Sequence, residues 1–158
     1  IELCNIYTSP LNITGAYFSA GITFAFGPDT KPIPPNGACI VLVKNLDAFA
    51  SRYDTNHMVI AGTFSGKLSN SGDLIETMDP RNEPIQSFRY DASWYPETDG
   101  GGFSLESSDV RGPLTNWAIK AGWQASELYG GTPGHVTPEP ALLAALALVL
   151  GLGWRRRA

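Results

Sequence analysis

Short runs of alternating hydrophobic and polar residues recur along the first two thirds of this chain. Such alternation is typical of β-strands whose two faces meet different surroundings. Gly, Pro, Asn and Asp, which favour turns, separate the runs. We therefore predict strands over residues 1–7, 17–26, 38–44, 57–64, 74–78, 85–90 and 103–106.

Two segments depart from this alternation. Residues 39–43 are Cys-Ile-Val-Leu-Val, a continuous apolar run that predicts a strand buried on both faces at the centre of the core. Residues 46–53 follow Asn45, a favourable N-cap, and place their large apolar side chains on one helical stripe. Seven short strands with one helical segment predict an all-β fold, an Ig-like β-sandwich.

Composition supports one strand-rich domain with an appendage. The chain has 158 residues and is 43% hydrophobic, enough to build a core, while 17 glycines and 12 prolines suit short strands joined by turns. Because three of the 11 Lys and Arg residues are the terminal arginines and no acid follows Glu139, the body carries 8 cations against 15 acids, a formal charge of −7. We expect no nucleic-acid partner for such an acidic body.

The chain has two cysteines, Cys4 and Cys39. In an oxidising compartment they could form a disulfide that stabilises the fold by about 3 to 4 kcal/mol. The alternative is a pair of buried free thiols, and the sequence leaves both open.

The C-terminus ends in an apolar segment. Residues 141–154 carry no polar side chain except the indole of Trp154, and an arginine triplet follows. As a helix the segment would reach about 21 Å, short of a hydrocarbon core of roughly 30 Å, but arginine snorkelling and local thinning can offset part of the difference. The arginines predict an inner-membrane helix with the body outside the cytoplasm.

A short motif stands directly before that segment. Pro138, Glu139 and Pro140 precede the apolar run, and Arg155, Arg156 and Arg157 close it. In this order the parts resemble the PEP-CTERM sorting signal. The resemblance implies an exosortase-type sorting protease as partner, which transfers the protein to the cell surface or the exopolysaccharide matrix. The alternative is a plain membrane anchor with Pro-Glu-Pro as a stiff linker; both interpretations place the body outside the cytoplasm.

A series of motifs also runs through the body in a set order. They are Pro-Pro-Asn-Gly at 34–37, the apolar strand at 40–43, the turn-rich run at 64–73, Trp-Tyr-Pro at 94–96, Asp-Gly-Gly-Gly at 99–102, Asn-Trp at 116–117 and Gly-Thr-Pro-Gly at 131–134. This order resembles the lamin-tail domain of bacterial secreted proteins. The resemblance implies a lamin-tail-type sandwich over residues 1–134 without the family's opening strand, a linker at 135–140, the helix at 141–154 and a basic tail at 155–158.

Aromatic residues supply the candidate ligand contacts. Trp94, Tyr95 and Tyr90 could form a stacking platform for sugar rings, whereas packing at the end of the core is the alternative, as it is for Trp117.

Residues suited to catalysis are sparse. Ser104 lacks the Gly-x-Ser-x-Gly elbow, and the two histidines have no zinc-site spacing. The oxygens of Asp79, Asn82 and Glu83 could bind calcium weakly, and Asp91 could pair with residue 97 or 99 as two carboxylates. The glycines at 100–102 indicate a turn rather than an anion site. We predict no enzymatic activity, no cofactor and no metal.

The leading hypothesis is a non-enzymatic interaction or structural module that contacts matrix polysaccharide or surface proteins. Because the chain opens at Ile1 with a strand-like Ile-Glu-Leu, we expect that it starts inside a longer protein rather than after a removed signal peptide. The second hypothesis is therefore a C-terminal accessory domain of a longer secreted enzyme. The third is a carbohydrate-binding module.

Overall fold

A computed structural model describes residues 1–134 of the chain. The linker predicted at 135–140, the sorting motif, the apolar helix and the basic tail lie outside the described residues. Among the residues that are described, no helix is long and apolar enough to cross a membrane.

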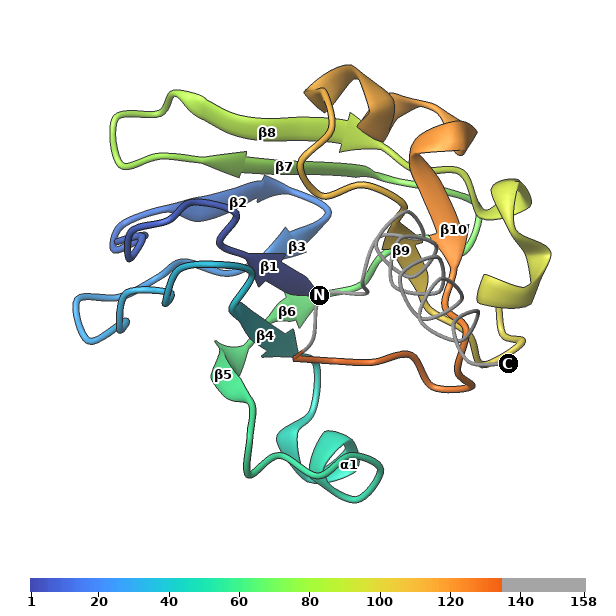
Figure 1. Cartoon of the computed structure of the whole chain (residues 1–158), viewed down its shortest axis with the longest axis horizontal. Helices are drawn as coiled ribbons and strands as arrows, with labels where there is room; N and C mark the ends of the chain where they lie inside the picture. The colour runs from blue at the N-terminus through green and yellow to red at the C-terminus, as the bar shows by residue number, and fades with distance from the viewer. Residues whose placement is uncertain (135–158) are drawn as a thin grey trace, which may run out of the picture.

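The described chain consists mostly of short strands in several small sheets (Figure 1). The strands are β1 (Glu2–Cys4), β2 (Tyr17–Ala20), β3 (Ile22–Thr23), β4 (Cys39–Val43), β5 (Val59–Thr63), β6 (Ser65–Gly66), β7 (Leu74–Met78), β8 (Pro84–Arg89), β9 (Leu105–Ser107) and β10 (Trp123–Ala125). The helices are α1 (Leu46–Ala50) and the 3-10 turns η1 (Ala92–Trp94), η2 (Pro96–Thr98), η3 (Leu114–Ala118) and η4 (Lys120–Gly122). The sheets are β1-β4-β5, β2-β7-β8, β3-β6 and β10-β9.

Each predicted strand segment holds a strand, and β7 has the predicted bounds. The long run at 17–26 divides into β2 and β3 because Gly21 adopts a φ of +88° between them. A side chain there would come within 2.9 Å of the Leu74 carbonyl oxygen, so only glycine fits this close approach. The strands β6 and β10 were not predicted, and β6 lies in the turn-rich run at 64–73.

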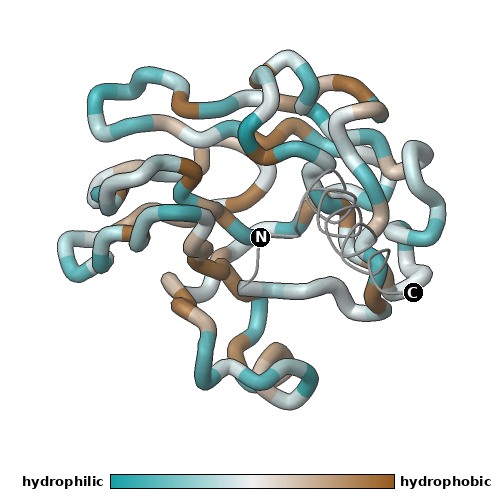
Figure 2. Tube along the Cα trace, viewed as in Figure 1, coloured by the Kyte–Doolittle hydropathy of each residue, from teal (hydrophilic) through white to brown (hydrophobic). Residues whose placement is uncertain are grey.

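The central strand β4 is buried along its whole length, as predicted. Its side chains are between 1% and 5% exposed, and it lies between antiparallel β1 and parallel β5. Figure 2 shows apolar residues concentrated along β4 and the chain around it. The buried core cluster comprises Ala16, Phe18, Ile22, Phe26, Ile33, Ile40 and Leu42.

The helix α1 connects the parallel strands β4 and β5. The Asn45 side chain accepts a hydrogen bond of 2.9 Å from Ala48 N, so the predicted N-cap is present. The helix ends at Ala50 rather than residue 53, although Tyr53 N still donates to Phe49 O at 3.0 Å. A parallel pair differs from the antiparallel sheets of a standard Ig-like sandwich, so the Ig-like architecture stays a prediction.

A disulfide joins Cys4 of β1 to Cys39 of β4. The two residues are direct partners in the antiparallel register, with their Cα atoms 4.0 Å apart. The sequence did not show whether these strands are neighbours; their pairing brings the two sulfurs together. The bond therefore attaches the first strand to the centre of the core.

Asn5 follows β1 and is completely buried. Its amide nitrogen donates to the carbonyl oxygens of Ser9 and Ile33, at 2.9 and 3.0 Å, and its side-chain oxygen accepts from Tyr7 N at 2.9 Å. A buried polar group is tolerated when its partners are complete. Asn5 thus holds the loop after β1 against the segment around Ile33.

Replacing both Cys4 and Cys39 with alanine should lower the free energy of unfolding by about 3 to 4 kcal/mol, because the bond closes a loop with a sequence separation of 35 residues. Chemical denaturation in urea measures the change. A reducing agent should destabilise the parent chain to a similar extent and leave the double variant unaffected. Equal stability of parent and variant would contradict the role given to the disulfide.

Asn5→Ala should lower the free energy of unfolding by about 2 to 4 kcal/mol, because it removes three hydrogen bonds made by a completely buried side chain. The matched control is Asn12→Ala. The Asn12 side chain accepts the same kind of bond, from Thr14 N at 2.9 Å, but is exposed. Urea denaturation of both variants is the measurement, and equally small losses would show that Asn5 does not brace the core.

Candidate functional site

Two loops meet at one end of the β2-β7-β8 sheet. Leu74 pairs with Arg89, and Tyr90 N donates to Asp73 O at 3.1 Å, so the loop before β7 lies beside the segment after β8. The sheet thereby places the turn at 69–72 next to η1 and η2.

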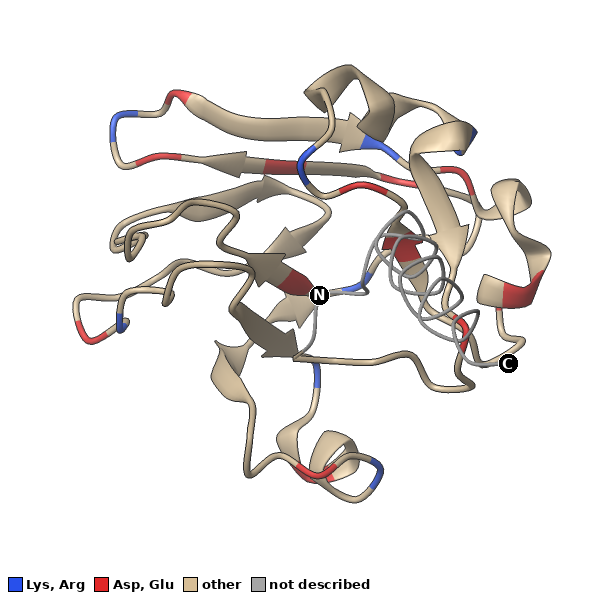
Figure 3. Cartoon of the chain, in the orientation of Figure 1, with Lys and Arg blue, Asp and Glu red and all other residues tan. Residues whose placement is uncertain are grey.

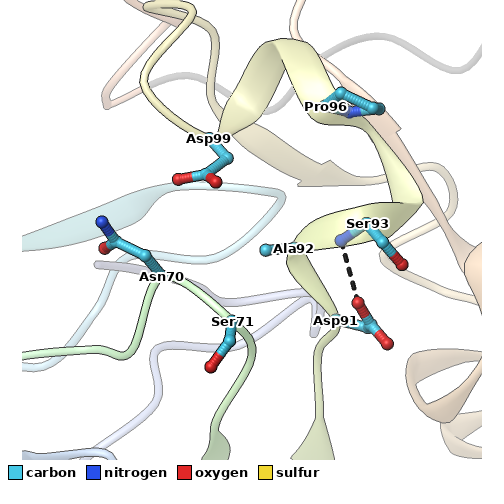
Figure 4. Close-up of a pocket in the computed structure, with 7 residues that line it drawn as sticks. All are labelled: Asn70, Ser71, Asp91, Ala92, Ser93, Pro96 and Asp99. Atoms are coloured by element: carbon cyan, nitrogen blue, oxygen red, sulfur yellow. Dashed lines mark hydrogen bonds between the residues drawn. The ribbon is translucent and has the colours of Figure 1, made fainter.

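Two adjacent hollows lie between these segments, of about 360 and 270 Å³. The larger is lined by Asn70, Ser71, Asp91, Ala92, Ser93, Pro96 and Asp99 (Figure 4). The smaller is lined by Ser71, Gly72, Arg89, Tyr90, Asp91, Trp94 and Ala118. Because Ser71 and Asp91 line both, we treat the hollows as one depression and call it the end groove.

The turn at 69–72 forms one wall of the end groove. The Tyr90 hydroxyl donates to the Ser69 carbonyl oxygen at 2.6 Å, which ties the turn to the end of β8. Gly72 has a φ of +110°, and a Cβ atom there would lie 2.5 Å from the Tyr90 carbonyl oxygen. Burial, followed by the Asp73 charge, raises the pKa of Tyr90, so its hydroxyl stays protonated as a donor at neutral pH.

The η1 and η2 turns form the opposite wall. Asp91 caps η1 by accepting a 2.8 Å hydrogen bond from Ser93 N. Hydrogen bonds from the side chain and the backbone of Ser93 lower the pKa of Asp91, so its carboxylate is ionised at neutral pH. In Figure 4 the Asp91 carboxylate turns toward Ser93, whereas the Asp99 carboxylate and the Asn70 amide lie on the other side of the hollow.

An aromatic cluster supports the groove from behind. Trp123 is buried, and its ring centroid lies 5.2 Å from those of Phe88 and Trp117 and 6.5 Å from that of Trp94. The Trp123 indole nitrogen donates to Trp117 O at 2.9 Å. Trp117 is therefore a packing residue, while Trp94 both packs on the cluster and lines the smaller hollow.

Of the three residues predicted as a stacking platform, two line the end groove and one does not. Tyr90 and Trp94 line the same hollow. Tyr95 is not among the lining residues; its hydroxyl donates to Trp123 O at 2.8 Å, and the Lys120 amine lies 5.0 Å from the centre of its ring. Tyr95 therefore braces the cluster instead of extending the platform.

The predicted calcium-binding oxygens take part in a turn. One Asp79 oxygen accepts hydrogen bonds from Arg81 N and Glu83 N, both at 2.8 Å, and the Asn82 side chain accepts from the Tyr17 hydroxyl at 2.7 Å. Within residues 1–134, the cluster of three metal-ligating residue types is Glu2, Cys4 and Cys39, and its two sulfurs are bonded to each other. Asp79 and Asn82 each have a side-chain oxygen that already accepts hydrogen bonds, and the two sulfurs are held in the disulfide.

Of the predicted carboxylate pairs, Asp91 and Asp99 line the larger hollow together, whereas Glu97 is not among its lining residues. Sequence reasoning missed Asn70, Ser71 and Arg89, which join the site only because β7 and β8 pair. In the sequence Asn70 and Ser71 are marked only by the polar turn Ser-Asn-Ser-Gly at 69–72, a pattern that is typical of ordinary surface loops. Figure 3 shows Lys and Arg dispersed singly over the described chain, so Arg89 brings one cation to a groove with two aspartates.

Comparison of the chain with protein-family models, with curated proteins and with solved structures yields no match.

Gly72→Ala should lower the free energy of unfolding by about 1 to 3 kcal/mol, because the new Cβ atom would clash with the Tyr90 carbonyl oxygen at an unfavourable φ. Gly27→Ala is the control, since a Cβ atom added there would have no neighbour within 4 Å and the φ of Gly27 is not in the left-handed region; we expect a change within about 0.5 kcal/mol. Thermal and urea unfolding report both. A stable Gly72→Ala protein would refute the close packing of this wall.

Proposed function

We propose that the chain is a non-enzymatic interaction module that works outside the cytoplasm. The observation that carries the proposal is the Cys4–Cys39 disulfide. Disulfides persist in the periplasm and at the cell surface but are rare in the reducing cytoplasm. The strand-rich fold, with loops gathered at one end of a sheet, suits a module that presents a binding surface on a rigid scaffold.

The C-terminal sequence supports the same location. Pro138, Glu139 and Pro140, the apolar residues 141–154 and the arginine triplet have the order of a PEP-CTERM signal. We propose that an exosortase-type protease is the sorting partner. The protein is then held in the inner membrane before it moves to the cell surface or the exopolysaccharide matrix.

The finer architecture is part of the proposal. We propose a lamin-tail-type, Ig-like arrangement for residues 1–134, supported by the buried strand β4 and by the order of motifs along the chain. The loops at the sandwich ends of such domains commonly carry their ligand contacts, and the end groove lies between loops at one end of the β2-β7-β8 sheet.

The electrostatics of Asp91 disfavour it as a general acid. A general acid at neutral pH needs a carboxyl group with a raised pKa. The hydrogen bonds from Ser93 lower the pKa of Asp91 instead. A carboxylate that is ionised at neutral pH is suited to accept hydrogen bonds from a ligand, as an interaction module requires.

The sorting step can be tested by expressing the full chain in an exosortase-bearing host, beside a variant with Pro138, Glu139 and Pro140 all changed to alanine. We expect the parent to lose its C-terminal segment and reach the surface, while the variant keeps its full mass in the membrane fraction. Intact mass spectrometry and fractionation provide the measurement.

The control for that experiment changes Pro28 and Pro32 to alanine, since both are exposed prolines of the body. This control should be processed like the parent. If parent and triple-alanine variant both stay full-length in the membrane, the segment is a plain anchor. If both are found in the cytoplasm, the proposed location is wrong.

A further inference from the structure

We infer that the end groove binds neutral pyranose units of a polysaccharide, with Trp94 and Tyr90 against a sugar ring in the smaller hollow and with Asn70 and Asp99 at sugar hydroxyl groups in the larger one. The inference rests on the proposed extracytoplasmic function and names the ligand class of that site. The two adjoining hollows of the groove have volumes of about 360 and 270 Å³, and the aromatic residues line the smaller one.

Two aromatic side chains line the groove and are held in position. The Trp94 ring packs on the buried Trp123, and the Tyr90 hydroxyl is fixed to the Ser69 carbonyl oxygen. A pyranose ring presents C–H groups on its faces, and the negative face of an aromatic ring attracts such groups. Because the rings are ordered beforehand, little side-chain entropy is lost when a sugar binds.

Polar side chains line the larger hollow, which adjoins the hollow that the two rings line. Asp91 and Asp99 accept hydrogen bonds, while Asn70, Ser71 and Ser93 can both donate and accept. Sugar hydroxyl groups also do both, so an edge that mixes carboxylate, amide and hydroxyl groups can pair with several of them at once. No hydrogen bond holds the Asp99 carboxylate or the Asn70 amide within the described residues, and both remain available to a ligand.

The net charge of the end groove favours neutral sugars over acidic ones. The groove has two aspartates and one cation, Arg89, and the pKa of Asp91 is lowered by its hydrogen bonds with Ser93. A phosphate or a uronate would meet net repulsion there. A neutral sugar chain meets none, and its backbone can continue out of both hollows because they adjoin.

The test uses the full chain in a detergent without a sugar headgroup. Neutral hexasaccharides of glucose, mannose, galactose and xylose are the probes, with a hexauronate as the acidic comparison and calcium chloride alone as the cation comparison. Isothermal titration calorimetry and tryptophan fluorescence follow binding. We expect at least one neutral hexasaccharide to bind, and the hexauronate to bind at least about tenfold more weakly.

Two variants place the binding in the groove. Asp99→Ala and Asn70→Ala remove exposed groups that hold no bond within the described fold, so each should keep its unfolding midpoint yet weaken binding by about tenfold, the size expected for one lost hydrogen bond to a charged or amide group. Trp94→Leu should weaken it further. The controls are Asp29→Ala and Tyr7→Ala, an exposed acid and an exposed aromatic outside the groove, which should bind like the parent.

The inference is overturned if no neutral hexasaccharide binds, if the hexauronate or calcium alone binds in preference, or if the Asp99 and Asn70 variants bind as the controls do. If one of these binding results is obtained and the chain is still processed and displayed at the surface, the sugar inference fails but the proposed location outside the cytoplasm holds. If the chain binds sugar in the groove but is never exported, the proposed location outside the cytoplasm is wrong and the inferred sugar ligand still holds.

Discussion

The burial of β4 between two partners is the constraint on which the rest of the structure depends. Five consecutive side chains are buried, so both faces of the strand need cover and both of its edges need a hydrogen-bonding neighbour. Antiparallel β1 covers one edge and is attached by the Cys4–Cys39 bond, whereas parallel β5 covers the other through the α1 crossover. The completely buried Asn5 fixes the chain as it leaves β1.

The end groove depends on a second pairing, that of β7 with β8. Their antiparallel register brings the turn at 69–72 against the segment after Tyr90. Tight contacts then set the shape of the wall, above all the close approach of Gly72 to the Tyr90 carbonyl oxygen. Behind the other wall, the cluster around Trp123 supplies rigidity. The groove is thus built from loops, but each loop is held by a sheet or by buried rings.

Strong local patterns could be predicted from the sequence, and arrangements in space could not. The apolar run of β4, the strand-like segment at 74–78 and the Asn45 cap are local signals; β4 is buried, β7 has the predicted bounds and the cap is present. The parallel pairing of β4 with β5 has no local signal, because alternation says nothing about which strand lies beside which. Tyr90 and Trp94 were identified as candidate stacking residues from their type, but their partners Asn70 and Ser71 lie about twenty residues earlier, and only the strand pairing unites them.

Thiol trapping in intact cells of an exosortase-bearing host would show whether the chain is a disulfide-stabilised module outside the cytoplasm. Cells that express the full chain are treated with an alkylating agent, and the alkylation state of Cys4 and Cys39 is then read by mass spectrometry with and without prior reduction. We expect both cysteines to escape alkylation until a reductant is added, and to be recovered as one linked peptide pair. Alkylation of both cysteines without reductant would contradict the proposed location, because the chain would then occupy a reducing compartment.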